Sequence, residues 1–128
     1  MWYALLMISD MDRAKLKGAV KSAIRQAFSR SDSYKGFLEL HRIEWYAGKR
    51  LRVSYPCACC GHKFPKKDIQ VDHIVPIGYG AYTGLEDALS YSELIYCSYD
   101  NLQILCRPCH TIKTNKEKAN KSFHNAVF

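Results

Sequence analysis

Cys57-Ala58-Cys59-Cys60-Gly61 and Cys106-Arg107-Pro108-Cys109-His110 are the two stretches that decide the fold of this chain. Each contains a C-x-x-C pair, a spacing that lets two sulfur atoms converge on one ion, and two such pairs fill the tetrahedral shell of zinc. Gly61 allows the positive φ that a turn of this kind commonly needs. The sequence therefore predicts a structural zinc site whose ligands are Cys57, Cys60, Cys106 and Cys109.

Two cysteines remain outside these pairs. Cys59 is the rival for a ligand position, but adjacent cysteines rarely bind one tetrahedral ion comfortably, and Cys97 is interpreted as a small buried hydrophobic residue. The paired spacing, in a chain without a recognisable secretory signal, favours zinc over disulfides. Four thiolates leave zinc no open coordination position, so any catalysis must take place elsewhere.

Composition and charge indicate one compact domain that favours polyanions. The chain has 128 residues, 48% of them hydrophobic, and a formal net charge of +7. Residues 1–55 contain eleven basic and five acidic residues, whereas residues 56–128 contain eight and seven. The basic N-terminal part favours nucleic acid or, less often, an anionic membrane, and a merely solvated face explains the charge equally well. No stretch approaches the ~20 apolar residues of a membrane span.

Hydrophobic periodicity predicts an α+β protein. Residues 1–49 are expected to form a basic helical region that packs on a core of residues 50–128, within one compact domain. The expected elements are helices at 10–29 and 34–47, strands at 50–55 and 69–75, a loop at 78–84, a helix at 85–95, a tight connection at 100–105 and a final helix from Pro108 to about residue 121. Ser9 or Asp10 is the expected N-cap of the first helix, and Asp32 or Ser33 that of the second.

Asp72 and His73 lie on the strand that the zinc site would hold near the final helix, which carries His110 in its first turn. A strand carboxylate and a helix imidazole can share one divalent cation, and a neutral histidine can accept a proton from water near pH 7. Each residue alone has an ordinary structural interpretation. His73 alone would be a packed histidine, Asn101 a turn residue, and His110 a helix-cap residue or a zinc ligand. Neighbouring strand residues point to opposite faces, so Asp72 and His73 can share a site only if the strand ends or twists there.

The segment from Cys57 to about Lys113 resembles the HNH endonuclease family. Val71-Asp72-His73-Ile74-Val75-Pro76 is similar to its first motif, Asp100-Asn101-Leu102 to its middle motif, and Cys106 to Thr114 to its zinc-containing last motif. The resemblance implies a ββα-metal fold (the His-Me finger) with a structural zinc site, preceded here by N-terminal helices. It also implies that His73 is the general base, that Asp72 and His110 bind Mg²⁺ or another divalent metal, and that Asn101 orients the base or its loop. Such proteins resemble those of bacteriophages and mobile elements, which implies a cytoplasmic location in a bacterial or phage-infected cell.

Three basic residues are candidates for DNA contact: Lys113, Lys116 and Arg107. Lys113 lies one turn after His110 and could hold a phosphate, or it could equally be a solvated lysine. Residues 78–97 are interpreted as an insertion containing a short helix. Five tyrosines in and beside it could contact DNA, although ordinary packing is the favoured role for most of them: Tyr79, Tyr82, Tyr91, Tyr96 and Tyr99. The expected substrate is double-stranded DNA.

The leading hypothesis is a metal-dependent DNA endonuclease or nickase. The alternatives are a non-catalytic zinc-dependent module that binds nucleic acid and an adaptor whose N-terminal helices bind a protein. The first alternative explains the cysteines and the charge but not the joint presence of Asp72, His73, Asn101 and His110. The sequence is compatible with a homodimer or with a phage or host protein partner, and a two-fold dimer would convert a nick into a double-strand break.

Overall fold

The computed structural model describes residues 8–77 and 88–127, and the side chains only as far as residue 120. The chain starts with helix α2 (Asp10–Ser29), as predicted, and its N-cap is Ser9, whose Oγ accepts a hydrogen bond from the Asp12 N–H. Asp10 and Asp12 lie in the first turn, where negative charge favours the helix dipole. Helix α3 (Asp32–His41) follows after a short break, and Ser31, rather than Asp32 or Ser33, is its N-cap.

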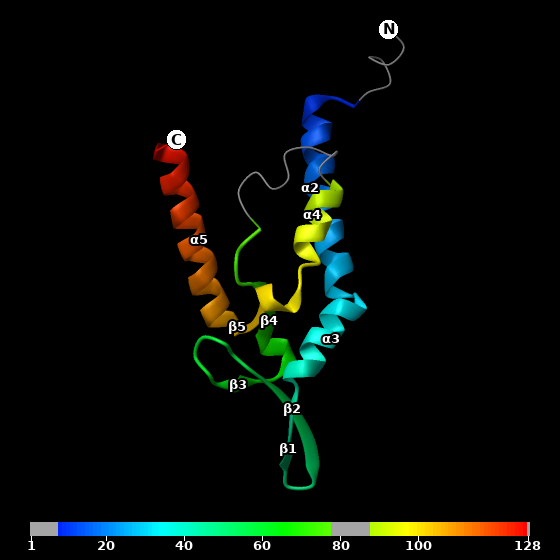
Figure 1. The fold of residues 1–128 in the computed structure, drawn as a ribbon, viewed down its shortest axis with the longest axis vertical. Helices are drawn as coiled ribbons and strands as arrows, with labels where there is room; N and C mark the ends of the chain where they lie inside the picture. The colour runs from blue at the N-terminus through cyan, green and yellow to red at the C-terminus, as the bar shows by residue number, and fades with distance from the viewer. Residues whose placement is uncertain (1–7, 78–87, 128) are drawn as a thin grey trace.

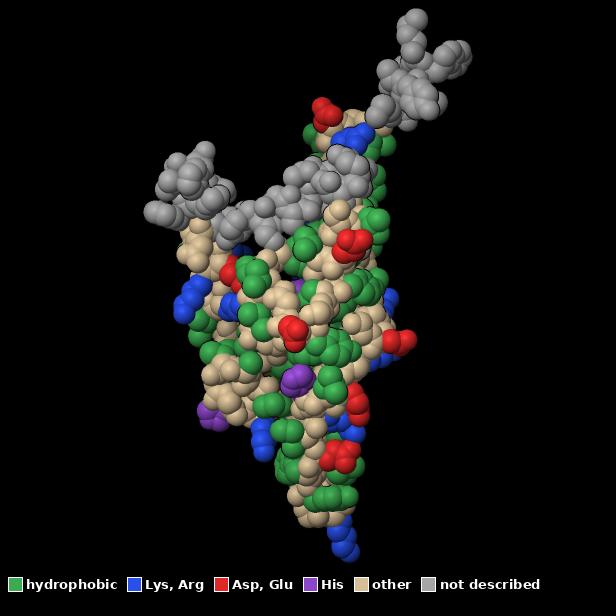
Figure 2. Space-filling model, viewed as in Figure 1, with side chains coloured by type: hydrophobic (Ala, Val, Ile, Leu, Met, Phe, Trp, Pro, Cys, Tyr) green, Lys and Arg blue, Asp and Glu red, His purple; other side chains and the backbone are tan. Residues whose placement is uncertain are grey.

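The predicted helix at 34–47 is wrong beyond His41. Arg42 has extended backbone, and strand β1 (Ile43–Ala47) pairs antiparallel with β2 (Arg50–Pro56), which itself confirms the strand predicted at 50–55. Gly48 occupies the turn with φ of 66°, a conformation that suits glycine. Trp45 therefore lies on a strand, where its Nε1 donates to Ser54 Oγ. The β1–β2 hairpin projects from the body of the protein, with basic side chains at its tip (Figures 1 and 2).

The second sheet and the last helix form the expected ββα unit. After the short strand β3 (Lys63–Phe64) and the 3₁₀ turn η1 (Lys66–Asp68), strand β4 (Ile69–His73) pairs antiparallel with β5 (Leu102–Cys106). The 3₁₀ turn η3 (Tyr99–Asn101) precedes β5. The predicted tight connection at 100–105 is thus mostly a strand, whereas the strand predicted at 69–75 ends two residues early. Helix α5 (Arg107–Val127) starts one residue before Pro108 and extends beyond the predicted end near residue 121.

Helix α4 (Ala88–Ile95) connects the ββα unit to the N-terminal helices. It packs beside α2 (Figure 1), and its Tyr91 and Ile95 are among the most buried side chains of the core. The predicted helix at 85–95 is confirmed from Ala88, whereas residues 85–87, the predicted loop at 78–84, and Tyr79 and Tyr82 lie outside the described residues. Buried core residues come from segments that are far apart in the sequence: Phe28, Phe37, Leu38, Tyr55, Ile69, Tyr91, Ile95, Leu102 and Ile104.

The architecture confirms the predicted α+β class, with helices and two small sheets. The division at residue 49 falls in the turn of the β1–β2 hairpin and stays a prediction. Within the described parts of the chain, every helix is too short or too polar to cross a membrane.

Candidate metal centre and active site

Four cysteine sulfurs converge where β2, β5 and α5 meet. Cys57 follows β2, Cys106 ends β5 and Cys109 lies in the first turn of α5. The Sγ atoms of Cys57, Cys60, Cys106 and Cys109 all lie within 4.8 Å of one another, which is the arrangement that a tetrahedral thiolate site needs. Gly61 has a φ of 75°, as the predicted turn requires, and its N–H donates to the Cys57 carbonyl at 2.9 Å. Cys59 is exposed and Cys97 is half-buried, and neither belongs to the group.

The surroundings of this four-cysteine group favour a cation. Burial raises the pKa of the Cys57 thiol, but backbone N–H groups of Cys106, Cys60 and Cys59 outweigh it and lower the pKa to about 6. The neighbouring Cys106 thiol, with burial and the Cys57 thiol, raises the pKa of Cys109 well above its usual range. Four thiolates at this spacing repel one another, which opposes loss of the final thiol proton. A bound divalent cation would offset that repulsion. The donor set therefore fits zinc.

A carboxylate and an imidazole come together where β4 contacts α5. The Asp72 side chain, on β4, is 11% exposed, and its Oδ1 lies 3.6 Å from His110 Nε2 on α5. An oxygen and an imidazole nitrogen brought together in this way suit a divalent metal of the Mg²⁺, Mn²⁺ or Zn²⁺ type. The structure thus places the predicted pair Asp72 and His110 together.

His73 and Asp72 both line one cavity, which lies between β4, α5 and α2. His73 is the last residue of β4, so the alternation of side chains between the two faces of the strand ends there. That is the condition under which Asp72 and His73 can share a site. The His73 Nε2 lies 2.9 Å from the Ile95 carbonyl oxygen. Because a carbonyl only accepts, Nε2 carries a proton, and in the neutral imidazole Nδ1 is then the nitrogen with the lone pair. The imidazole is therefore held in a tautomer that can act as a base.

Asn101 holds the segment that follows His73. Its Oδ1 accepts from the Val75 N–H at 2.8 Å, its Nδ2 donates to the Val75 carbonyl, and its own carbonyl accepts from the Ile74 N–H. Asn101 is not among the residues that line the cavity. Its contacts are those of a positioning residue that fixes the chain beyond the base.

Lys113 is engaged inside the site. Its Nζ donates to the His73 carbonyl at 2.9 Å and to Asp72 Oδ2 at 3.0 Å, and it forms an ion pair with Glu117. Burial lowers the pKa of Lys113, but Glu117 and Asp72 outweigh it and raise the pKa, so the ammonium stays charged at neutral pH. With Oδ2 of Asp72 bound to Lys113, Oδ1 is the carboxylate oxygen that faces His110.

The other two predicted DNA-contact residues lie outside this cavity. The exposed Arg107 donates through Nε to the Lys67 carbonyl at 3.0 Å, which fixes η1 to the start of α5. Lys116 is exposed on α5 and lines a separate hollow beside Cys59 and Cys109.

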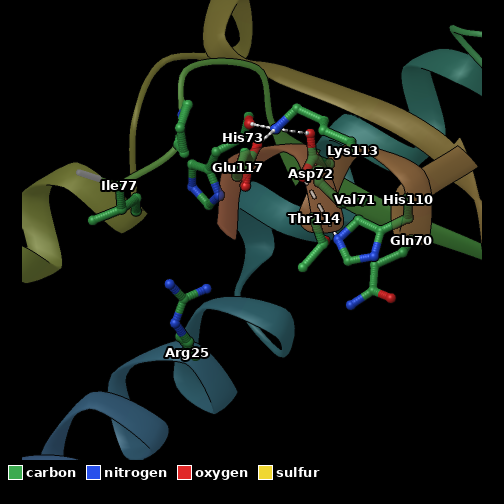
Figure 3. A pocket seen from close by; sticks show the side chains of 11 residues that line it. Arg25, Gln70, Val71, Asp72, His73, Ile77, His110, Lys113, Thr114 and Glu117 are labelled. Atoms are coloured by element: carbon green, nitrogen blue, oxygen red, sulfur yellow. Dashed lines mark hydrogen bonds and ion pairs between the residues drawn. The ribbon is translucent and has the colours of Figure 1, made fainter. Parts of the chain in front are cut away.

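The cavity, of about 330 Å³, lies between β4, α5 and α2 (Figure 3). Asp72, His73, His110, Lys113, Thr114 and Glu117 line it together with Arg25, which reaches in from α2. Sequence reasoning missed Glu117 and Arg25. The four-residue spacing from Lys113 could have indicated Glu117, whereas no local pattern marks Arg25, whose position depends on how α2 packs.

Comparisons with known proteins agree with this geometry. The family model described as HNH endonuclease matches residues 57–116, the segment that contains the four-cysteine group, Asp72, His73 and His110. A "Probable HNH endonuclease" of Lactococcus phage SK1 is 37% identical over 84 residues, which cover 63% of this chain and 80% of the relative. No solved structure matches the chain significantly. On this evidence the chain belongs to the HNH endonuclease family.

Proposed function

We propose that this protein is a metal-dependent DNA endonuclease or nickase. Family membership supports a nuclease, and the observation that carries the finer assignment is the single cavity that Asp72, His73 and His110 share. In this proposal His73 is the general base, and Asp72 and His110 bind Mg²⁺ or another divalent metal. The four-cysteine group binds a structural zinc ion whose closed thiolate shell takes no part in the reaction.

His73 would accept the proton of the attacking water at Nδ1. The Ile95 carbonyl holds the Nε2 proton and stabilises the imidazolium that forms, in the way that a second hydrogen-bonding partner orients a catalytic histidine. Lys113 fixes both neighbouring groups, because it binds the carbonyl of His73 and the carboxylate of Asp72. A bound divalent cation would supply charge neutralisation at the phosphate and leaving oxygens.

Asn101 has a positioning role in this proposal, since its amide and carbonyl groups fix Ile74 and Val75 directly after the base. Lys116, Arg107 and the basic N-terminal helices would contact backbone phosphates of double-stranded DNA, a sequence-independent attraction that weakens steeply with salt. The relative from a phage and the zinc-type spacing of the cysteines suit the cytoplasm of a bacterial host.

The zinc-loaded protein should convert supercoiled plasmid to nicked or linear DNA with Mg²⁺ or Mn²⁺, and EDTA should stop the reaction. A gel shift with duplex DNA in the same buffers separates the alternatives. Binding without cleavage in every metal would indicate a non-catalytic nucleic-acid-binding module, and the absence of both would indicate an adaptor. Either result would overturn the proposed function.

A further inference from the structure

Arg25 brings a guanidinium group to the cavity from outside the segment that the family model matches. It lies near the C-terminal end of α2, is exposed, and points across the cavity toward the side of β4 and α5 (Figure 3). An arginine from outside the matched segment therefore lies opposite His73, Asp72 and His110.

A buried tyrosine holds this arginine. The Arg25 Nε–H donates to the Tyr91 hydroxyl at 2.8 Å, and the guanidinium carbon lies 5.9 Å from the centre of the Tyr91 ring. Tyr91 is 2% exposed, so its hydroxyl is a fixed point. A guanidinium has five N–H donors, and Nε uses one. No hydrogen bond from either terminal NH₂ group to the described residues is present, so both can bind a ligand.

The charges around the cavity show what that ligand would be. The other cation that lines it, Lys113, is bound to Asp72, Glu117 and the His73 carbonyl. Among residues 8–77 and 88–120, no carboxylate lies within ion-pair distance of Arg25. A guanidinium presents paired donors that match two oxygens of a phosphate, and such an anion can approach the open cavity.

We infer that Arg25 is a substrate-binding residue that holds a non-bridging phosphate oxygen of the DNA backbone in this cavity, and that Tyr91 is its positioning residue. This inference rests on the proposed nuclease function. Charge on the phosphate oxygens increases as water attacks, so a fixed guanidinium would stabilise the transition state more than the bound substrate. A purely structural arginine that joins α2 to α4 would affect stability instead.

The experiment compares single-turnover cleavage of a labelled duplex, with saturating Mn²⁺ and zinc-loaded protein, by wild type, four test variants and one control variant. Arg25→Met should lower the maximal rate on the order of 100-fold, and Arg25→Lys should lie between it and wild type. Tyr91→Phe should lower the rate on the order of tenfold, and the double variant Tyr91→Phe/Arg25→Met should be no slower than Arg25→Met alone. Arg52→Met, which removes the same charge from exposed β2, is the matched control and should stay within about twofold of wild type.

Duplex binding by the His73→Ala protein, measured by fluorescence anisotropy, separates this inference from the proposed function. Adding Arg25→Met to that protein should raise Kd at least about fivefold, and adding Arg52→Met should raise it less than about twofold. If wild type cleaves but Arg25→Met cleaves and binds as wild type does, the role of Arg25 is wrong while the nuclease function stands. If wild type does not cleave, the nuclease function fails, and the binding comparison alone decides whether Arg25 holds phosphate.

Discussion

His73→Ala is expected to abolish cleavage while the protein keeps its fold and its zinc. The imidazole would be the group that removes the proton from water. Because general-base catalysis contributes about 10²–10⁴-fold, the cleavage rate should fall by at least that factor. Fold and zinc should survive because the ring lies at the end of β4 and lines the cavity, away from the four-cysteine group. Plasmid cleavage, zinc content and circular dichroism measured on the same preparation test all three expectations.

The cost to stability should be small but measurable. The substitution removes the hydrogen bond to the Ile95 carbonyl and the contact with Phe28, whose ring centre lies 5.7 Å away. Such a loss is expected to lower the free energy of unfolding by about 1–3 kcal/mol. His62→Ala is the matched control, because His62 is exposed and lies outside the cavity. Full cleavage activity in His73→Ala would remove the base from the proposed mechanism.

Cys106→Ala is expected to lose zinc and to unfold the region around β5. Cys106 is 3% exposed, ends the strand that pairs with β4, and lies with the other three thiols in one group. Metal binding of this kind contributes about 10–16 kcal/mol in small zinc domains, which is as large as the whole stability of a typical domain, about 5–15 kcal/mol. Loss of the zinc should therefore abolish the cooperative thermal transition or lower Tm strongly.

Cys59→Ala provides the control, because Cys59 is exposed and lies outside the group even though it is next to Cys60. This variant should keep one zinc per chain and a Tm close to that of wild type. A soluble, cooperatively folded Cys106→Ala protein without zinc would show that the metal is not needed to hold β5 and α5.

The sequence predicted those parts of the fold that depend on local pattern. The apolar stripe of α2, the alternation of β2 and the C-x-x-C spacings are properties of neighbouring residues, and the structure confirms the elements and brings the four cysteines together. The predicted helix at 34–47 includes strand β1 because apolar residues there recur at helical spacing, as His41 and Trp45 do four residues apart. Pairing with β2, a contact that a helical pattern does not reveal, makes 43–47 a strand.

The residues of the candidate site were likewise predicted only in part from the sequence. Motif order and spacing predicted that Asp72, His73 and His110 would meet, and they line one cavity. Arg25 was not predicted, since its place depends on the packing of α2 against α4 and on a hydrogen bond to a residue 66 positions away. For Lys113 the sequence favours a phosphate contact and a solvated lysine equally. The structure adds contacts with Asp72 and Glu117 that come from tertiary packing and from helix spacing.

The most direct test of a catalytic metal site separate from the zinc scaffold is a Mn²⁺ titration of cleavage. Zinc-loaded wild type would be mixed with one labelled duplex, and the single-turnover rate would be followed as Mn²⁺ is added. We expect no cleavage without added metal, a saturable rise, and a midpoint at least about tenfold higher in Asp72→Asn, with zinc at one per chain throughout. Full cleavage with zinc alone, or no cleavage at any Mn²⁺ concentration, would contradict the assignment of Asp72, His73 and His110 as the reaction centre.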